Sequence, residues 1–202
     1  MSEALQSEQP ASRGMSPKHP SPLRLLCLAV LLLLLGASAA RADTITVKSA
    51  ELLAEDDNYV LNAQFDFSFN PTLEEALHKG ISLYFVLEFE LGRPRWYWLD
   101  EKLAQVTVQH RLSYAPLTRQ YRLTSGLLSQ QFDSLEEVER ILSRVVSRPV
   151  VSRDALAKGT RYDAALRLRL DQTQLPKPFQ INALASRDWA LQSDWYRWNF
   201  TP

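Results

Sequence analysis

Cysteine is almost absent from this chain of 202 residues, whose single example, Cys27, lies in an apolar run near the N-terminus. The rest of the chain can therefore form no disulfide, thiol nucleophile or thiolate metal site. Histidine is also scarce, since only His78 and His110 follow the apolar run. We expect no metal, because zinc and copper sites need clusters of such ligands. Stability must come from a buried core.

Glycine is rare too, and its positions argue against several enzyme classes. Beyond residue 42 the four glycines each fall at an expected element boundary, where glycine suits a turn. No glycine-rich phosphate loop is present, and no G-x-S-x-G or S-x-x-K pattern follows residue 42. We therefore expect no cofactor and no serine nucleophile.

The chain has no excess of either charge, with 23 basic and 23 acidic residues. Residues 1–42 contain four of the basic and two of the acidic residues, which leaves 19 and 21. A mildly acidic domain has no field that attracts nucleic acid, so we do not expect that partner.

A secretory signal is the clearest motif. Residues 25–35 read LLCLAVLLLLL, with Lys18 and Arg24 before them and small residues at A-x-A spacing after them. Cleavage fits before Ala40 or before Asp43, and we favour Asp43 because a strand pattern begins there. The alternative is an uncleaved inner-membrane anchor over residues 25–40, but a span needs about 20 apolar residues.

We therefore expect residues 1–42 to be an N-terminal extension and signal peptide, and residues 43–202 to form a single domain in the periplasm. The polar residues 1–14 leave two start sites open, Met1 and Met15.

Alternation of apolar and polar residues dominates the rest of the chain. It predicts half-buried antiparallel strands, strong over some segments and weaker over others. The strong segments are 59–70, 81–91, 103–114 and 162–170, and the weaker ones are 44–54, 120–124, 179–184 and 195–200.

Two helices are predicted between these strands. Asn70, Pro71 and Gly80 bracket a two-turn helix. Residues 133–149 suggest a longer one, with a Ser134–Glu137 capping box and an apolar stripe.

The pattern Leu156, Gly159 and Tyr162 at the opening of a strand resembles the tyrosine corner of immunoglobulin-like domains. The predicted fold is mainly β: a two-sheet antiparallel sandwich, immunoglobulin-like, of seven to eight strands with two short helices. A β-barrel is the alternative.

All five tryptophans fall in two clusters, RPRWYWLDE at residues 93–101 and RDWALQSDWYRWNF at residues 187–200. Burial in the core is the ordinary use of tryptophan. Aromatics beside arginine are also typical of interaction surfaces and membrane interfaces. The candidate interaction surface is Arg93, Arg95, Trp96, Tyr97, Trp98, Tyr196, Arg197 and Trp198.

Four segments stand out when they are taken together: FNPTLEEALHKGISLYFVLEFEL, RPRWYWLDE, LSYAPLTRQYRL and SDWYRWNF. In combination they resemble an uncharacterised family labelled proline-rich signal peptide proteins of Gram-negative bacteria, domain of unknown function number 4390. The resemblance covers nearly all of residues 43–202 and implies an exported protein without established activity. It defines no catalytic or binding residue.

We expect a non-enzymatic binding or interaction module whose partner is an unknown envelope protein or a membrane surface. One alternative is a hydrolase-type enzyme with an unrecognised site near His110 and Asp100/Glu101. A second alternative is a structural protein of the envelope.

Overall fold

The computed structural model describes residues 45–93 and 101–202. In this part of the chain the elements are nine strands, three helices and three short 3-10 turns. The strands are β1 (Thr46–Glu55), β2 (Asn58–Asp66), β3 (Leu83–Arg93), β4 (Glu101–Ala115), β5 (Gln120–Ser125), β6 (Leu128–Phe132), β7 (Arg144–Ser152), β8 (Tyr162–Leu170) and β9 (Tyr196–Phe200). The helices are α2 (Pro71–His78), α3 (Leu135–Leu142) and α4 (Lys177–Ala185).

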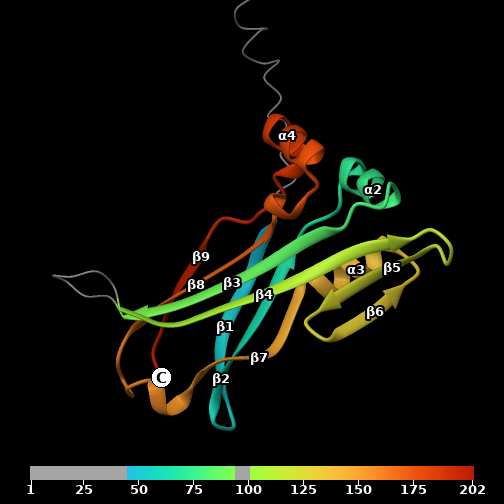
Figure 1. Ribbon diagram of the computed structural model, residues 1–202. Coiled ribbons are helices and arrows are strands. Elements are labelled where there is room, and N and C mark those ends of the chain that lie inside the picture. Colours follow the sequence, from blue (N-terminus) through green and yellow to red (C-terminus); the bar gives the residue numbers. More distant parts are fainter. Residues whose placement is uncertain (1–44, 94–100) are drawn as a thin grey trace, which may run out of the picture. The chain divides into compact units, whose positions relative to one another are not determined.

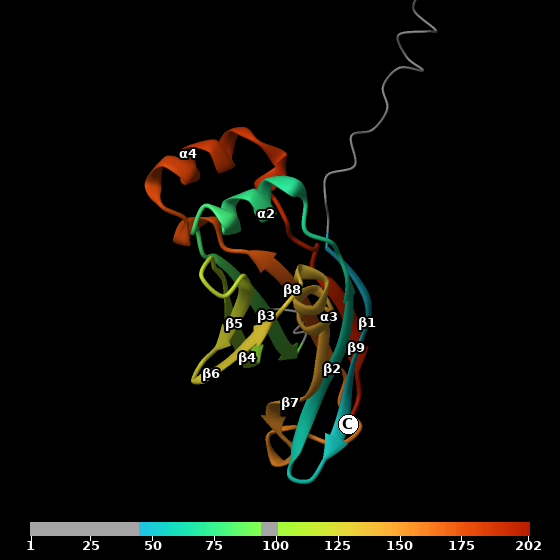
Figure 2. The same ribbon diagram turned by 90° about the vertical axis from the view of Figure 1, so that its right-hand side faces the viewer.

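The strands form two antiparallel sheets that face one another (Figures 1 and 2). The smaller sheet has the order β1-β2-β7, and the larger has the order β6-β5-β4-β3-β8-β9. Four consecutive strands, β3 to β6, form a meander, and β8 and β9 extend the sheet beyond β3. The predicted two-sheet antiparallel sandwich is confirmed, with nine strands rather than seven or eight and a third helix.

The core lies between the sheets and follows the period of two that the sequence predicts. On β3, the side chains of Leu83, Phe85, Phe89 and Leu91 are fully buried. Leu61 and Phe65 of β2 meet them from the smaller sheet. These side chains supply the apolar burial that a domain without disulfides needs.

The tyrosine corner is present at the start of β8. The backbone N–H of Ala157 donates a hydrogen bond to the Tyr162 hydroxyl at 2.8 Å, and the Tyr162 ring is fully buried. This bond to backbone five residues upstream holds the chain as it enters the strand.

Helix α2 begins as the sequence predicts. The Asn70 side chain accepts a hydrogen bond from the backbone N–H of Leu73 at 2.9 Å, and Pro71 follows it. Asn70 also donates to the Asp188 carbonyl at 2.7 Å, which ties α2 to the turn after α4. These two segments lie side by side at one end of the sandwich (Figures 1 and 2).

Two element predictions are wrong, and one strand was not predicted. The helix predicted over 133–149 stops at Leu142, and β7 begins at Arg144, because this segment pairs with β2. The strand predicted over 179–184 is part of α4, whose first turn contains Pro178. The polar strand β6 was not predicted, since it lacks an apolar face.

Among the described residues, no helix combines the length and apolar character needed to cross a bilayer.

Candidate functional site

A groove on the sandwich arises from strands of unequal length. Strand β4 has 15 residues and β5 has six, and β5 pairs only with residues 110–115 of β4. Residues 102–109 of β4 therefore pair with β3 on one side and, within the described chain, with no strand on the other. A groove lies along this open edge, with β7 of the smaller sheet across from it.

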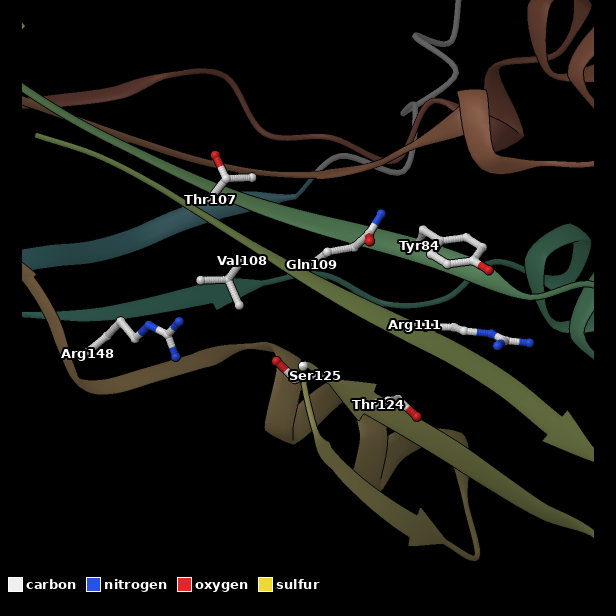
Figure 3. Close-up of a pocket in the computed structure, with 9 residues that line it drawn as sticks. Tyr84, Thr107, Val108, Gln109, Arg111, Thr124, Ser125 and Arg148 are labelled. Carbon is white, nitrogen blue, oxygen red and sulfur yellow. The ribbon is translucent and has the colours of Figure 1, made fainter.

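We call this hollow the β4 groove. It has a volume of about 600 Å³. Figure 3 shows Arg148 extending from β7 toward β4, while Tyr84 of β3 and Arg111 of β4 lie on the other side. The lining residues are Tyr84, Thr107, Val108, Gln109, Arg111, Thr124, Ser125, Gly126 and Arg148.

Both charged residues that line the β4 groove are arginines. Arg111 donates to the Ser82 hydroxyl at 3.1 and 3.2 Å, and its guanidinium lies 5.9 Å from the centre of the Tyr84 ring. Neither Arg111 nor Arg148 forms an ion pair with any carboxylate of the described chain. The groove therefore offers two guanidinium groups, each with the planar donors that suit carboxylate or phosphate.

The acids nearest to the groove are already paired elsewhere. Glu88 of β3, opposite Thr107, accepts hydrogen bonds from Arg167 and Arg169 of β8. Glu90 pairs with Lys102 at 3.1 Å. Because these carboxylates are paired with other bases, they do not neutralise the two arginines, and the groove is positively charged.

His110 lies on the inner face of β4, beside the groove. Burial lowers the pKa of His110, and the charge of Arg148 lowers it further, which favours the neutral form of the ring. Its Nδ1 is buried without a hydrogen-bond partner in the described chain.

The acid predicted to act with His110 is not near it. Glu101 lies nine residues away along the same strand, about 30 Å at the rise of a β-strand. Asp100 lies outside the described residues. Within the described chain, the arrangement around His110 therefore offers no acid–base pair.

Half of the predicted interaction surface, Arg95, Trp96, Tyr97 and Trp98, lies outside the described residues. Arg93 is half-buried at the end of β3, where it donates to the Tyr162 hydroxyl at 3.4 Å and lies 5.7 Å from the ring centre. Hydrogen bonding from Arg93 lowers the pKa of Tyr162. Arg93 thus supports the tyrosine corner.

The other predicted residues lie on β9 and alternate between its faces. Tyr196 and Trp198 pair with the buried residues Leu166 and Ala164, so they face inward at the edge of the sandwich. Trp198 is half-buried against Phe89, with ring centres 6.2 Å apart, and Tyr196 is 37% exposed. Arg197 faces outward, so the three residues do not form one surface.

Arg197 lines a smaller hollow of about 180 Å³ on the outer face of the larger sheet. Its charged residues are two acids and two bases, Glu90, Asp163, Lys102 and Arg197. This hollow is balanced in charge, whereas the β4 groove is not. A charged ligand is therefore better matched to the β4 groove.

Little in the sequence indicates the β4 groove. Arg111 stood in a predicted strand and Arg148 at the end of a predicted helix, 37 positions apart. Only the pairing of β7 with β2 brings Arg148 to face β4. The detectable signal was the short β5, since a six-residue strand cannot cover a strand of 15.

No group of three or more histidine, cysteine or acidic residues in the described chain is arranged to hold a metal ion.

The fold and the groove define an antiparallel β-sandwich with one open, arginine-lined edge. Residues 42–199 match the model of the family described as Domain of unknown function (DUF4390), and the chain belongs to that family. No curated protein and no solved structure matches the chain.

Proposed function

We propose that this protein is a periplasmic binding module without a catalytic role, and that it holds an anionic ligand in the β4 groove. One observation supports the site above all: Arg111 and Arg148 line the same hollow, and no carboxylate of the described chain pairs with either. Charge-assisted hydrogen bonds from guanidinium groups are among the strongest polar contacts available to a ligand.

A binding role fits the surroundings of His110 better than a hydrolytic one. A general base must lie within hydrogen-bond reach of the proton it takes, and a partner usually orients it. The Nδ1 of His110 is buried, and the ring has no orienting acid in the described chain. The described lining of the groove therefore contains groups that bind anions, and no described acid orients His110 as a general base beside it.

Export is supported by the leader sequence and by the extent of the family match. The apolar run at residues 25–35 has the length of a signal peptide, and A-x-A spacing follows it. The match to the family begins at residue 42, next to the favoured cleavage point.

The mature protein is expected to begin at Asp43, because Ala40 and Ala42 then occupy the two small-residue positions of the signal. Mass spectrometry of the protein from an osmotic-shock fraction measures this directly. A chain that begins at Ala40 would move the cleavage point, and a membrane-bound chain that retains residues 25–40 would contradict periplasmic release.

The site is tested by titrating the protein, produced with its own leader, with a short glutamate-rich peptide and with citrate. Replacing both Arg111 and Arg148 by glutamate is expected to weaken binding at least about tenfold, because two charge-assisted contacts are lost. Arg187→Glu, an exposed arginine on the turn after α4, is the matched control and should leave binding unchanged.

Arg197→Glu tests the rival surface on β9. Loss of binding in Arg197→Glu, with binding intact in the double groove variant, would place the ligand on β9 and contradict the proposal. Unchanged binding in both variants would also contradict it.

A further inference from the structure

The open part of β4 is the least protected strand edge in the described chain. Natural edges are protected by shortness, charge, proline or bulges. Edge strands β6 and β9 have five residues each, β1 contains Lys48, Glu51 and Glu55, and β7 contains Pro149 and two register shifts. Residues 103–109 of β4, LAQVTVQ, contain neither a charge nor a proline.

The backbone of this edge is available for pairing. Along a strand, every second residue directs its N–H and C=O groups away from a given neighbour. Over about 27 Å, residues 102–109 therefore present donors and acceptors that no strand of the described chain pairs. Valine and threonine in this segment favour extended pairing. An added strand would lie about 4.8 Å from β4, inside the β4 groove.

The side chains around the edge define what such a strand would contain. On the outer face of the larger sheet, an added strand would meet Thr107, Gln109 and Arg111. On the inner face it would meet Val108, which is 9% exposed, and the guanidinium of Arg148. Acidic side chains therefore suit the arginines, and apolar ones suit Val108.

An apolar contact is also available next to the groove. Gly126 and Leu127 form the turn between β5 and β6, next to the lining residue Ser125. Leu127 and the first residue of β6, Leu128, are 105% and 74% exposed. Exposed leucines beside a polar, arginine-lined groove are typical of a docking surface for another polypeptide.

We propose that the β4 groove binds an extended acidic segment of a partner protein, which adds as a strand to the open edge of β4. This inference rests on the proposed function, since it specifies the anionic ligand of the same groove. The backbone of the segment supplies affinity by pairing with residues 102–109, and its acidic side chains supply specificity through Arg111 and Arg148. A second copy of this chain fits less well, because its own arginines would meet those of the first.

The test uses four probes with the protein produced with its own leader. The first is a peptide of about eight residues, matched to the open edge, with glutamate on both faces opposite Arg111 and Arg148 and valine or threonine at the other positions. The second has lysine in place of glutamate, the third has N-methyl groups on alternate backbone nitrogens, and the fourth is citrate. Titration gives affinities, and hydrogen exchange gives protection of the β4 amides.

The acidic peptide is expected to bind and to slow exchange of amides within residues 103–109 at least about tenfold. Both the lysine peptide and the N-methylated peptide should bind at least about tenfold more weakly, and Arg148→Glu should weaken the acidic peptide by a similar factor.

The contradicting outcomes separate the two proposals. Equal affinity of the N-methylated and unmodified peptides, or unchanged exchange in β4, would overturn strand addition while leaving an anion site in place. If citrate binds as tightly as the peptide and depends equally on Arg148, strand addition would also be overturned, and the anion site would remain. Acidic probes that bind independently of Arg111 and Arg148 would overturn the proposed function itself, and dimerisation that blocks the edge would identify a second copy as the occupant.

Discussion

Replacing Phe85 by alanine is expected to lower the free energy of unfolding by about 3–5 kcal/mol, the usual cost of truncating a fully buried phenylalanine. Phe85 is the third residue of β3, and its ring contacts Phe69 at 5.6 Å and Phe67 at 6.3 Å between ring centres. Phe67 and Phe69 belong to the segment between β2 and α2. The substitution therefore removes the contact that joins the larger sheet to the segment leaving the smaller one.

Urea denaturation followed by circular dichroism measures this effect. Phe85→Leu, which keeps most of the volume, should cost less than about 1.5 kcal/mol. Val146→Ala is the exposed control, since Val146 is 75% exposed, and it should stay within about 0.5 kcal/mol of the wild type. A loss below about 1 kcal/mol in Phe85→Ala would show that the two-sheet core is not packed as described.

Replacing Glu88 by glutamine is expected to destabilise the domain by about 1–3 kcal/mol at pH 7, because it leaves two half-buried arginines without their carboxylate. Glu88 accepts from Arg169 at 3.2 Å and also from Arg167, and its side chain is 17% exposed. Burial raises the pKa of Glu88, but the hydrogen bonds from Arg167 and Arg169 outweigh it, and the pKa is lowered.

The lowered pKa of Glu88 determines how its contribution to folding stability depends on pH. A carboxylate with a folded-state pKa below its unfolded value near 4.5 contributes its full stability above that value. The contribution is lost as the pH falls through the folded-state pKa. Glu88→Gln should therefore lose less stability than the wild type as the pH falls below about 4.5.

Glu139 provides a control of opposite sign. Burial raises the pKa of Glu139 above its ordinary value, and the repulsion of Glu136 adds to this effect. Its protonation therefore favours the folded state as the pH falls. Glu139→Gln should therefore lose folding stability more steeply than the wild type as the pH falls, whereas Glu88→Gln should lose it less steeply. Denaturation midpoints at a series of pH values measure both slopes. Equal slopes in both variants would contradict the ion-pair account of Glu88.

Local rules predicted the elements whose burial pattern is regular. Strand β8 has the predicted bounds because its apolar residues alternate without interruption, and α2 begins at Pro71 because Pro71 and the Asn70 cap act locally. Strand β7 was misassigned because Leu142 and Val145 continue the spacing of α3. Residues from Arg144 onward form a strand because they pair with β2, and the β-branched residues Val145 and Val146 favour that extended conformation.

The β4 groove could not be predicted in the same way. It depends on how far β5 pairs along β4, and hairpin length is a property of two segments together. It also depends on Arg148, whose position follows from a β7 that local periodicity concealed. The aromatic prediction found Tyr196, Arg197 and Trp198, but the pleat of β9 places the arginine opposite the two rings.

The central claim is that the β4 groove is the binding site, and chemical-shift mapping of the isotopically labelled protein with the acidic peptide tests it most directly. The account predicts that the largest shifts cluster at residues 107–111, at Ser125 and Gly126, and at Arg148. Shifts centred on residues 196–198 of β9, with the amides of β4 unmoved, would contradict it.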